Sequence, residues 1–460
     1  MNRQFFYKYG LIGLLALGLM IPLGMVQDLV RERANYREQA RQSIAESWTG
    51  AQQVLGPVLV VPYKQLVPKQ VWDERLSAYR TETRELSGRL HILPERLAVE
   101  GKASTELRSR GLYNVPVYLA ALSLEGSFDN RPLLELLEQA EYPVELERPF
   151  VSVLLSDIRG LVTQPRLQWG DEQRIFDAGS GFGQTMGIQA PLTTLESQTP
   201  ATYPFRFELA LRGMERIAFA PVGKESRVDL NLAWPHPSFT GRYLPSSHEI
   251  DGQGFRAVWQ VSAFSSNIAG DVETCGAGTC QALLSNIFGV TLVEPVDIYH
   301  QTERAVKYGL LFVVLTFVAF FLFEVGRRLR LHPMHYLLVG SALTLFYLLL
   351  LSLSEHFPFA LAYWAASLAA TGLIGLYAGS VMGPWRRGMG ITAMLLGLYG
   401  LLFAILRSED NALLMGSLLL FAVLASVMLA TRRMDWFAIG EHMGRQRAEQ
   451  RADRARAVRS

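Results

Sequence analysis

Several features that would mark common enzyme classes are missing from this chain of 460 residues. It has two cysteines and no second cysteine pair that could complete a zinc site. The glycine-rich stretch 178–187 lacks the order of a phosphate loop and the spacing of a dinucleotide fingerprint, and it does not form a Gly-x-Ser-x-Gly elbow. The formal net charge of +2 gives no indication of nucleic-acid binding. We therefore expect no cofactor and no enzymatic activity.

Charge is almost absent from the last third of the chain. Short charged breaks divide residues 306–430 into five apolar runs, at 308–323, 334–353, 359–382, 389–406 and 412–430. Each run is close to the roughly 20 residues that a helix needs to cross a bilayer. A helix is required because lipid offers the backbone no hydrogen-bond partner. We therefore predict a five-helix transmembrane bundle over 306–430.

The arginines predict the orientation of this bundle. They cluster after the first, third and fifth runs, whereas the two alternate breaks carry acidic residues. Because positive residues collect on the cytoplasmic side, the first run enters from outside and the C-terminus is cytoplasmic. The arginine-rich segment 431–460 is then a basic cytoplasmic tail, which is either simply solvated or in contact with anionic headgroups.

An uncharged run at 9–27 follows a basic start. A cleaved signal peptide is the alternative interpretation, but no small-x-small cleavage pattern follows the run. We predict a transmembrane anchor over 1–27, with the N-terminus cytoplasmic. In the next segment, 28–50, apolar residues recur every four positions at Tyr36, Ala40, Ile44 and Trp48, which predicts an amphipathic helix.

Residues 51–305 have a different periodicity. Short segments of alternating apolar and polar residues, bounded by Gly, Pro, Asn and Asp, predict antiparallel strands in a sandwich-like domain, with one short helix at 131–139. The predicted fold is therefore a multi-pass α-helical membrane protein with six transmembrane helices and a large β-rich periplasmic domain between helices 1 and 2. The length allows one or two β domains, and the glycine-rich stretch is the expected boundary between two.

Two sets of residues in the β-rich part are candidate sites. Cys275 and Cys280 lie outside the cytoplasm in the predicted topology, where a disulfide is favoured over metal binding. The run that contains Trp234, His236, Phe239 and Tyr243 is rich in aromatic and proline residues. It is either a recognition loop, because rigid residues lose little entropy on binding, or a corner that packs on the sheet.

Three expectations concern the helical part. Gly375, Gly379 and Gly383 recur every four residues and permit close helix packing, within the bundle or with a second copy. Glu324 and Glu355 flank predicted spans, so no carboxylate lies at mid-bilayer, which argues against an ion-coupled transporter. We also expect Glu355, His356 or Arg407 to pair with residues 297–304 or with the helix at 28–48.

Several motifs make the chain resemble the CreD family of inner-membrane proteins. They include Gly56-Pro57 before a strand, Trp234-Pro-His-Pro-Ser-Phe239, and the runs 32–37, 304–308, 330–340 and 346–356. The resemblance covers nearly the whole chain and implies the inner membrane of a Gram-negative bacterium. It also implies a role in envelope integrity, linked to a two-component sensory system. It implies no catalytic residues. The cysteine pair and the long arginine-rich tail are outside the family pattern.

The leading functional hypothesis is a non-enzymatic inner-membrane protein that supports envelope integrity or a stress response. Its partners would be the lipid bilayer and an envelope protein or glycan bound by the periplasmic domain. The alternatives are an enzyme that modifies envelope polysaccharide through scattered Asp, Glu and His residues, and a subunit of a transport complex.

Overall fold

A computed structural model describes residues 3–73, 78–182, 185–193, 195–293, 298–326, 331–382, 385–408 and 412–432. The described residues form two compact units. The helical unit comprises residues 1–37 and 296–460, and the β-rich unit comprises residues 38–295. The tail from residue 433 lies outside the described residues, as do Arg327, Arg328 and Arg330.

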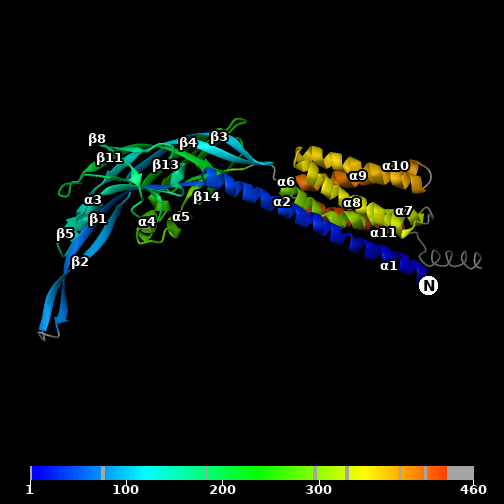
Figure 1. The fold of residues 1–460 in the computed structure, drawn as a ribbon, viewed down its shortest axis with the longest axis horizontal. Coiled ribbons are helices and arrows are strands. Elements are labelled where there is room, and N and C mark those ends of the chain that lie inside the picture. Colours follow the sequence, from blue (N-terminus) through cyan, green and yellow to red (C-terminus); the bar gives the residue numbers. More distant parts are fainter. Residues whose placement is uncertain are drawn as a thin grey trace, which may run out of the picture. The chain divides into compact units, whose positions relative to one another are not determined.

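The β-rich unit is built from two sheets (Figure 1). The nine-stranded sheet has the order β14-β17-β12-β1-β6-β10-β9, and β2 and β5 also pair with β1. Its strands are β1 (Gln52–Asp73), β2 (Ala78–Ile92), β5 (Val144–Leu146), β6 (Phe150–Leu155), β9 (Asp177–Ala178), β10 (Gly187–Pro191), β12 (Arg216–Phe219), β14 (Pro237–Gly241) and β17 (Phe288–Leu292).

The eight-stranded sheet has the order β15-β16-β13-β3-β4-β11-β7-β8. Its strands are β3 (Arg96–Arg110), β4 (Tyr113–Asp129), β7 (Arg166–Trp169), β8 (Glu172–Ile175), β11 (Thr202–Met214), β13 (Glu225–Leu232), β15 (Ser247–Ile250) and β16 (Phe255–Ser262). Among the described residues, three α-helices lie between these strands, α3 (Arg131–Gln139), α4 (Ile268–Gly276) and α5 (Gln281–Ser285).

One hydrophobic core is shared by the two sheets. In β13 the burial alternates, so Val228, Leu230 and Leu232 face the core and Arg227 is exposed. Side chains from both sheets join the same buried cluster, which is the arrangement of a sandwich. Two pairings depart from the expected antiparallel pattern, because β1 with β12 and β3 with β13 are parallel. Local alternation predicts a strand but not the direction of its neighbour.

The glycine-rich stretch is not a boundary between two domains. It connects β9 and β10, which are neighbours in one sheet, and Ser180 and Phe182 within it are buried. The Ser180 hydroxyl donates to the Thr185 carbonyl, 2.7 Å away. Residues 38–295 form one compact unit.

A long two-stranded arm extends from the nine-stranded sheet (Figure 1). Beyond Gln65, β1 pairs with β2 alone, up to the pair Asp73 and Ala78. Trp72 and Tyr79 lie opposite each other near its end, with their ring centroids 5.1 Å apart, and both are exposed. The sequence predicted only the first part of this strand, because charged residues interrupt the alternation after Tyr63.

Two helices cover the segments predicted as an anchor and an amphipathic helix, but they divide at Leu19 and not after residue 27. These are α1 (Arg3–Gly18) and α2 (Met20–Ser47). Of the predicted stripe, Ala40 and Ile44 are buried, whereas Tyr36 is 45% exposed. Ile44 packs in the β-rich unit against Val115, Val117 and Met214.

The helical unit contains the apolar helices that were predicted. They are α7 (Gly309–Gly326), α8 (Pro333–Ser354), α9 (Phe359–Met382), α10 (Trp385–Arg407) and α11 (Ala412–Thr431), and the more polar α6 (Ile298–Lys307) precedes α7. Four helices within the described residues are long and apolar enough to span a membrane: the N-terminal helix over Gly10–Ser47, α8, α9 and α10. The number rises to five if α6 and α7, which are bent by 43° relative to each other, form one span. A sixth span would require α11, whose apolar stretch Leu414–Ala425 is shorter.

The predicted glycine row lies between α9 and α10. A Cβ atom added at Gly388 would lie 2.7 Å from the Gly375 carbonyl oxygen and 2.8 Å from Gly379 Cα. Gly375 in turn faces Thr392 of α10. The row therefore permits close packing inside the unit, as expected for small residues at a helix interface in lipid. Gly383 lies outside the described residues.

Candidate functional site: a groove on the eight-stranded sheet

A groove lies over the solvent-facing side of the eight-stranded sheet, with a volume of about 850 Å³. Apart from Gly170, which follows β7, the lining residues come from six strands, β16, β13, β3, β4, β11 and β7. Strand register aligns one residue of each strand in a single row across the sheet, in the order Gln260, Arg227, Ala98, Glu125, Arg206 and Gln168. Successive residues alternate between the two faces of a strand, so this row shares the outer face.

Small residues form the floor of this groove. Ala98 and Ser127 lie on β3 and β4 at the centre of the sheet. Gly126, between Glu125 and Ser127 on β4, faces the core side, where a Cβ atom would lie 2.8 Å from the ring of the buried Phe205. Larger side chains surround these short ones, both on β3 and β4 themselves (Arg96 and Glu125) and on the flanking strands (Arg227 and Arg206). The sequence therefore produces a hollow in a regular sheet.

Cations and anions alternate on the walls of the groove. Arg96 and Glu225 approach to 3.8 Å, and Arg206 and Glu125 to 4.0 Å. At these distances the ion pairs are loose rather than charge-assisted hydrogen bonds, which are about 2.7–2.9 Å long. All four side chains are more than half exposed. Their donors and acceptors are therefore accessible to a ligand.

Arg227 is the third cation of the groove. Its guanidinium lies 3.8 Å from Asp229, but Asp229 accepts two hydrogen bonds from Arg256, at 3.0 and 2.8 Å. The Arg256 guanidinium holds the pKa of Asp229 below its usual range, so this carboxylate stays ionised and bonded to Arg256. The planar fork of Arg227 remains suited to a carboxylate from a ligand.

The chemistry of the groove fits binding better than catalysis. Its lining carries arginines, glutamates, glutamines and serines but neither histidine nor cysteine. The part of the chain that the structure describes has no group of three His, Cys, Asp or Glu residues able to hold a metal ion. Each glutamate lies nearest to an arginine, whereas a general base would have to face a reacting proton.

The four aromatic and histidine residues predicted for binding lie elsewhere, at the β14 edge of the nine-stranded sheet. Trp234 donates its indole N–H to the carbonyls of His236 and Val293, both at 3.2 Å. Phe239 contacts the rings of Phe255 and Trp259.

Tyr243 packs edge-on against Phe288 and donates to the Ser265 carbonyl at 3.3 Å. Trp234, Phe239 and Tyr243 are half-buried against the core, and His236 is exposed. The structure therefore favours the packed-corner interpretation over a recognition loop.

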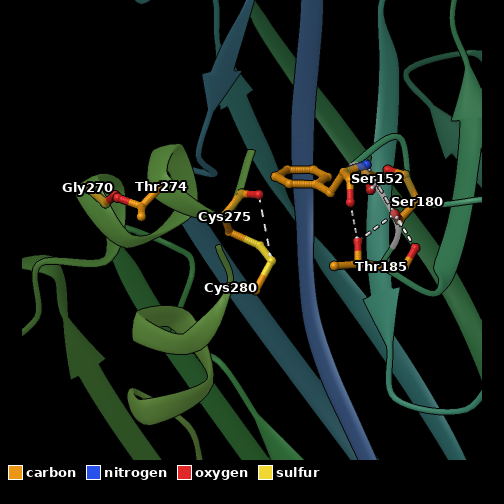
Figure 2. The surroundings of a disulfide bond; sticks show 8 residues. Ser152, Ser180, Thr185, Gly270, Thr274, Cys275 and Cys280 are labelled. Atoms are coloured by element: carbon orange, nitrogen blue, oxygen red, sulfur yellow. Dashed lines mark hydrogen bonds between the residues drawn. A yellow bond between two sulfur atoms is a disulfide. The ribbon is translucent and has the colours of Figure 1, made fainter. Parts of the chain in front are cut away.

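Cys275 and Cys280 are joined by a disulfide in the structure (Figure 2). Cys275 is the penultimate residue of α4 and is buried, and Cys280 immediately precedes α5 and packs partly on the core. The bond closes the short turn between the two helices. This turn contacts β2, because Gly276 lies against the His91 ring.

His91 makes the stability of the β-rich unit sensitive to acid. Burial lowers its pKa, and the nearby Arg89 lowers it further. Protonation of His91 is therefore easier in the unfolded chain than in the folded one. The stability that neutral His91 contributes is fully present above pH 6.5 and is lost as the pH falls below that value.

We expect His91→Gln to flatten the decline in unfolding temperature of the full chain between pH 7 and pH 5. The exposed His236→Gln is the control and should retain the decline of the wild type. An unchanged slope for His91→Gln would contradict this assignment.

Two carboxylates of the helical unit form ion pairs with the N-terminal helices. Glu324 was expected beside a span, but it lies inside α7, because this helix continues beyond the predicted end at Phe323. Its side chain is buried, with 4% of the residue exposed. It pairs with Lys8 and accepts hydrogen bonds from Tyr336 Oη at 3.0 Å and from Leu331 N–H at 3.2 Å.

The expected pairing of Glu355 is confirmed within the helical unit. Its carboxylate lies 3.8 Å from Arg33 Nε and accepts a hydrogen bond from Tyr299 Oη at 3.3 Å. Arg33 belongs to α2 and Tyr299 to α6. One carboxylate thus joins three helices.

Comparison with known proteins identifies the family. A family model described as "Inner membrane protein CreD" matches residues 4–437. The Inner membrane protein CreD of Escherichia coli (strain K12) is 35% identical over 422 residues, which cover 91% of this chain and 91% of that protein. The motifs that suggested this resemblance lie within the matched range, and the apolar helices agree with a membrane protein. The chain therefore belongs to the CreD family of inner membrane proteins.

Proposed function

We propose that this protein supports the cell envelope by binding an envelope component in the groove of its β-rich unit. In this proposal the β-rich unit is periplasmic, six helices span the inner membrane and both termini are cytoplasmic. The observation that carries the proposal is the groove itself, with a small-residue floor and accessible charges of both signs. Concave surfaces with a few convergent polar groups are the usual form of a binding site.

Filling the groove tests this function. We expect Ala98→Trp to abolish the ability of the gene to restore deoxycholate resistance to a deletion strain, because an indole on the floor would occupy the space of the ligand. Ala121→Trp is the matched control, since Ala121 is exposed on the same sheet and does not line the groove. Both variants should accumulate to wild-type levels on immunoblots. Full resistance with Ala98→Trp would refute the proposal.

The orientation has a separate test. A reporter that is active only outside the cytoplasm should work when it is fused after Ser266 or Asp410. It should be inactive after Arg328, Arg387 or Ser460, because the arginine clusters stay on the cytoplasmic side. Activity after Arg387 would contradict the proposed number of spans, and inactivity after Ser266 would place the β-rich unit on the other side.

A further inference from the structure

We infer that the ligand of the groove is an extended peptide that carries both carboxylate and ammonium groups. This inference rests on the proposed function and names the chemical class of the ligand. It is drawn from the order of charges across the sheet, the strand register and the size of the floor.

The order of charges selects a ligand of mixed sign. Arg227 and Arg206 belong to the same row, with Glu125 directly opposite Arg206, and Glu225 faces Arg96 in the adjacent row. A polyphosphate or an anionic membrane surface would be attracted by the arginines but repelled by the two glutamates. A zwitterionic ligand satisfies both, since its carboxylates meet guanidinium groups and its ammonium groups meet carboxylates.

The ends of the row add amide chemistry. Gln260 lies opposite Arg227, and Gln168 lies opposite Arg206. A glutamine side chain offers both a carbonyl acceptor and N–H donors, which are the partners that a peptide backbone requires. A neutral sugar chain could use these amides, but it has no carboxylate to offer to the three arginines of the groove, whose ion pairs within the protein are loose.

The dimensions agree with a short chain. Arg227 and Arg206 are separated by three strand spacings, or about 14 Å. An extended hexapeptide spans about 20 Å and reaches both. Ala98 lies between them in the row and leaves room for the chain to cross the floor. The ligand therefore lies across the strands, with its charged groups on either side of Ala98.

The test is capture of peptides from a pooled library of random hexapeptides with free termini, using full-length protein immobilised in detergent. We expect the wild type to enrich peptides that carry both acidic and basic side chains. Arg206→Glu with Arg227→Glu should reduce this enrichment at least tenfold. Lys102→Glu with Arg110→Glu is the matched control, because both residues are exposed on β3 outside the groove and the charge change is the same.

A second variant tests the role of the glutamates. Glu125→Lys with Glu225→Lys should shift the captured peptides towards acidic residues only, a change of specificity that a misfolded protein would not produce. Equal enrichment by the wild type and the arginine variant would overturn the inference. So would arginine-dependent binding of polyphosphate or of phosphatidylglycerol vesicles in place of peptides.

The two proposals fail separately. If Ala98→Trp abolishes detergent resistance but the wild type enriches no peptides, the proposed function is supported and the peptide ligand is refuted. Full resistance with Ala98→Trp would instead remove the proposed function, whatever the groove captures.

Discussion

Replacing Gly388 by leucine is expected to disrupt the packing of α9 against α10. The new Cβ atom would lie 2.7–2.9 Å from the Gly375 carbonyl oxygen and from Gly379 Cα and N, all of which are backbone atoms. Backbone cannot rotate away as a side chain can, so the two helices must separate. Overpacking of this kind costs about 1–3 kcal/mol and occasionally more. We expect a marked fall in the unfolding temperature of the purified protein in detergent.

Gly390→Leu is the matched control for this substitution. Gly390 lies two residues further along α10, and a Cβ atom there would have no neighbour within 4 Å. This variant should melt like the wild type. Equal destabilisation by the two substitutions would show that helix propensity or hydrophobicity, and not the contact with α9, determines the result.

The second large effect is expected at the ion pair between Lys8 and Glu324. Glu324→Leu removes a carboxylate that pairs with the ammonium of Lys8 and accepts a hydrogen bond from the Tyr336 hydroxyl. Removing one partner of a buried pair costs about 3–5 kcal/mol, because the other charge remains desolvated. Lys8 is partly exposed, so we expect a value near the lower limit. Unfolding by titration with sodium dodecyl sulfate measures it.

The double variant separates the charge from the packing. Adding Lys8→Met to Glu324→Leu removes the remaining charge and should recover part of the lost stability. Asp28→Leu is the control, since the Asp28 side chain is 78% exposed, and it should change stability by no more than about 0.5 kcal/mol. A double variant no more stable than Glu324→Leu would contradict the role of the ion pair.

The strands and helices were predictable where one short-range pattern determined them. Val228, Leu230 and Leu232 alternate with polar residues, and the structure has a strand there. The helix predicted at 131–139 is α3. The arm beyond Tyr63 was missed because charged residues interrupt its alternation, and the parallel pairing of β1 with β12 was missed because its partners are distant in sequence.

The groove could not be predicted for the same reason. Arg227, Ala98 and Arg206 come from three strands; the two arginines are ordinary exposed residues of their own segments, and Ala98 is half-buried. Only register places them in one row. The Trp234 run, by contrast, was a candidate binding site because its aromatic and proline residues are adjacent in sequence. Dense aromatic composition indicates burial as readily as binding, and here Trp234 and Phe239 pack on the core.

The parallel pair of β1 and β12 has a consequence for biosynthesis. Gln52 at the start of β1 is paired with Ile217, which is 217 − 52 = 165 residues later in the chain. At about 5–20 residues per second, the ribosome adds that partner roughly 8–33 s after β1. Until then Gln52, Gln53 and Val54, the first residues of the strand at the centre of the larger sheet, lack their partner, whereas β2 can pair with β1 from Leu59 onwards. The larger sheet is therefore completed only after β12 and its neighbour β17 have been made.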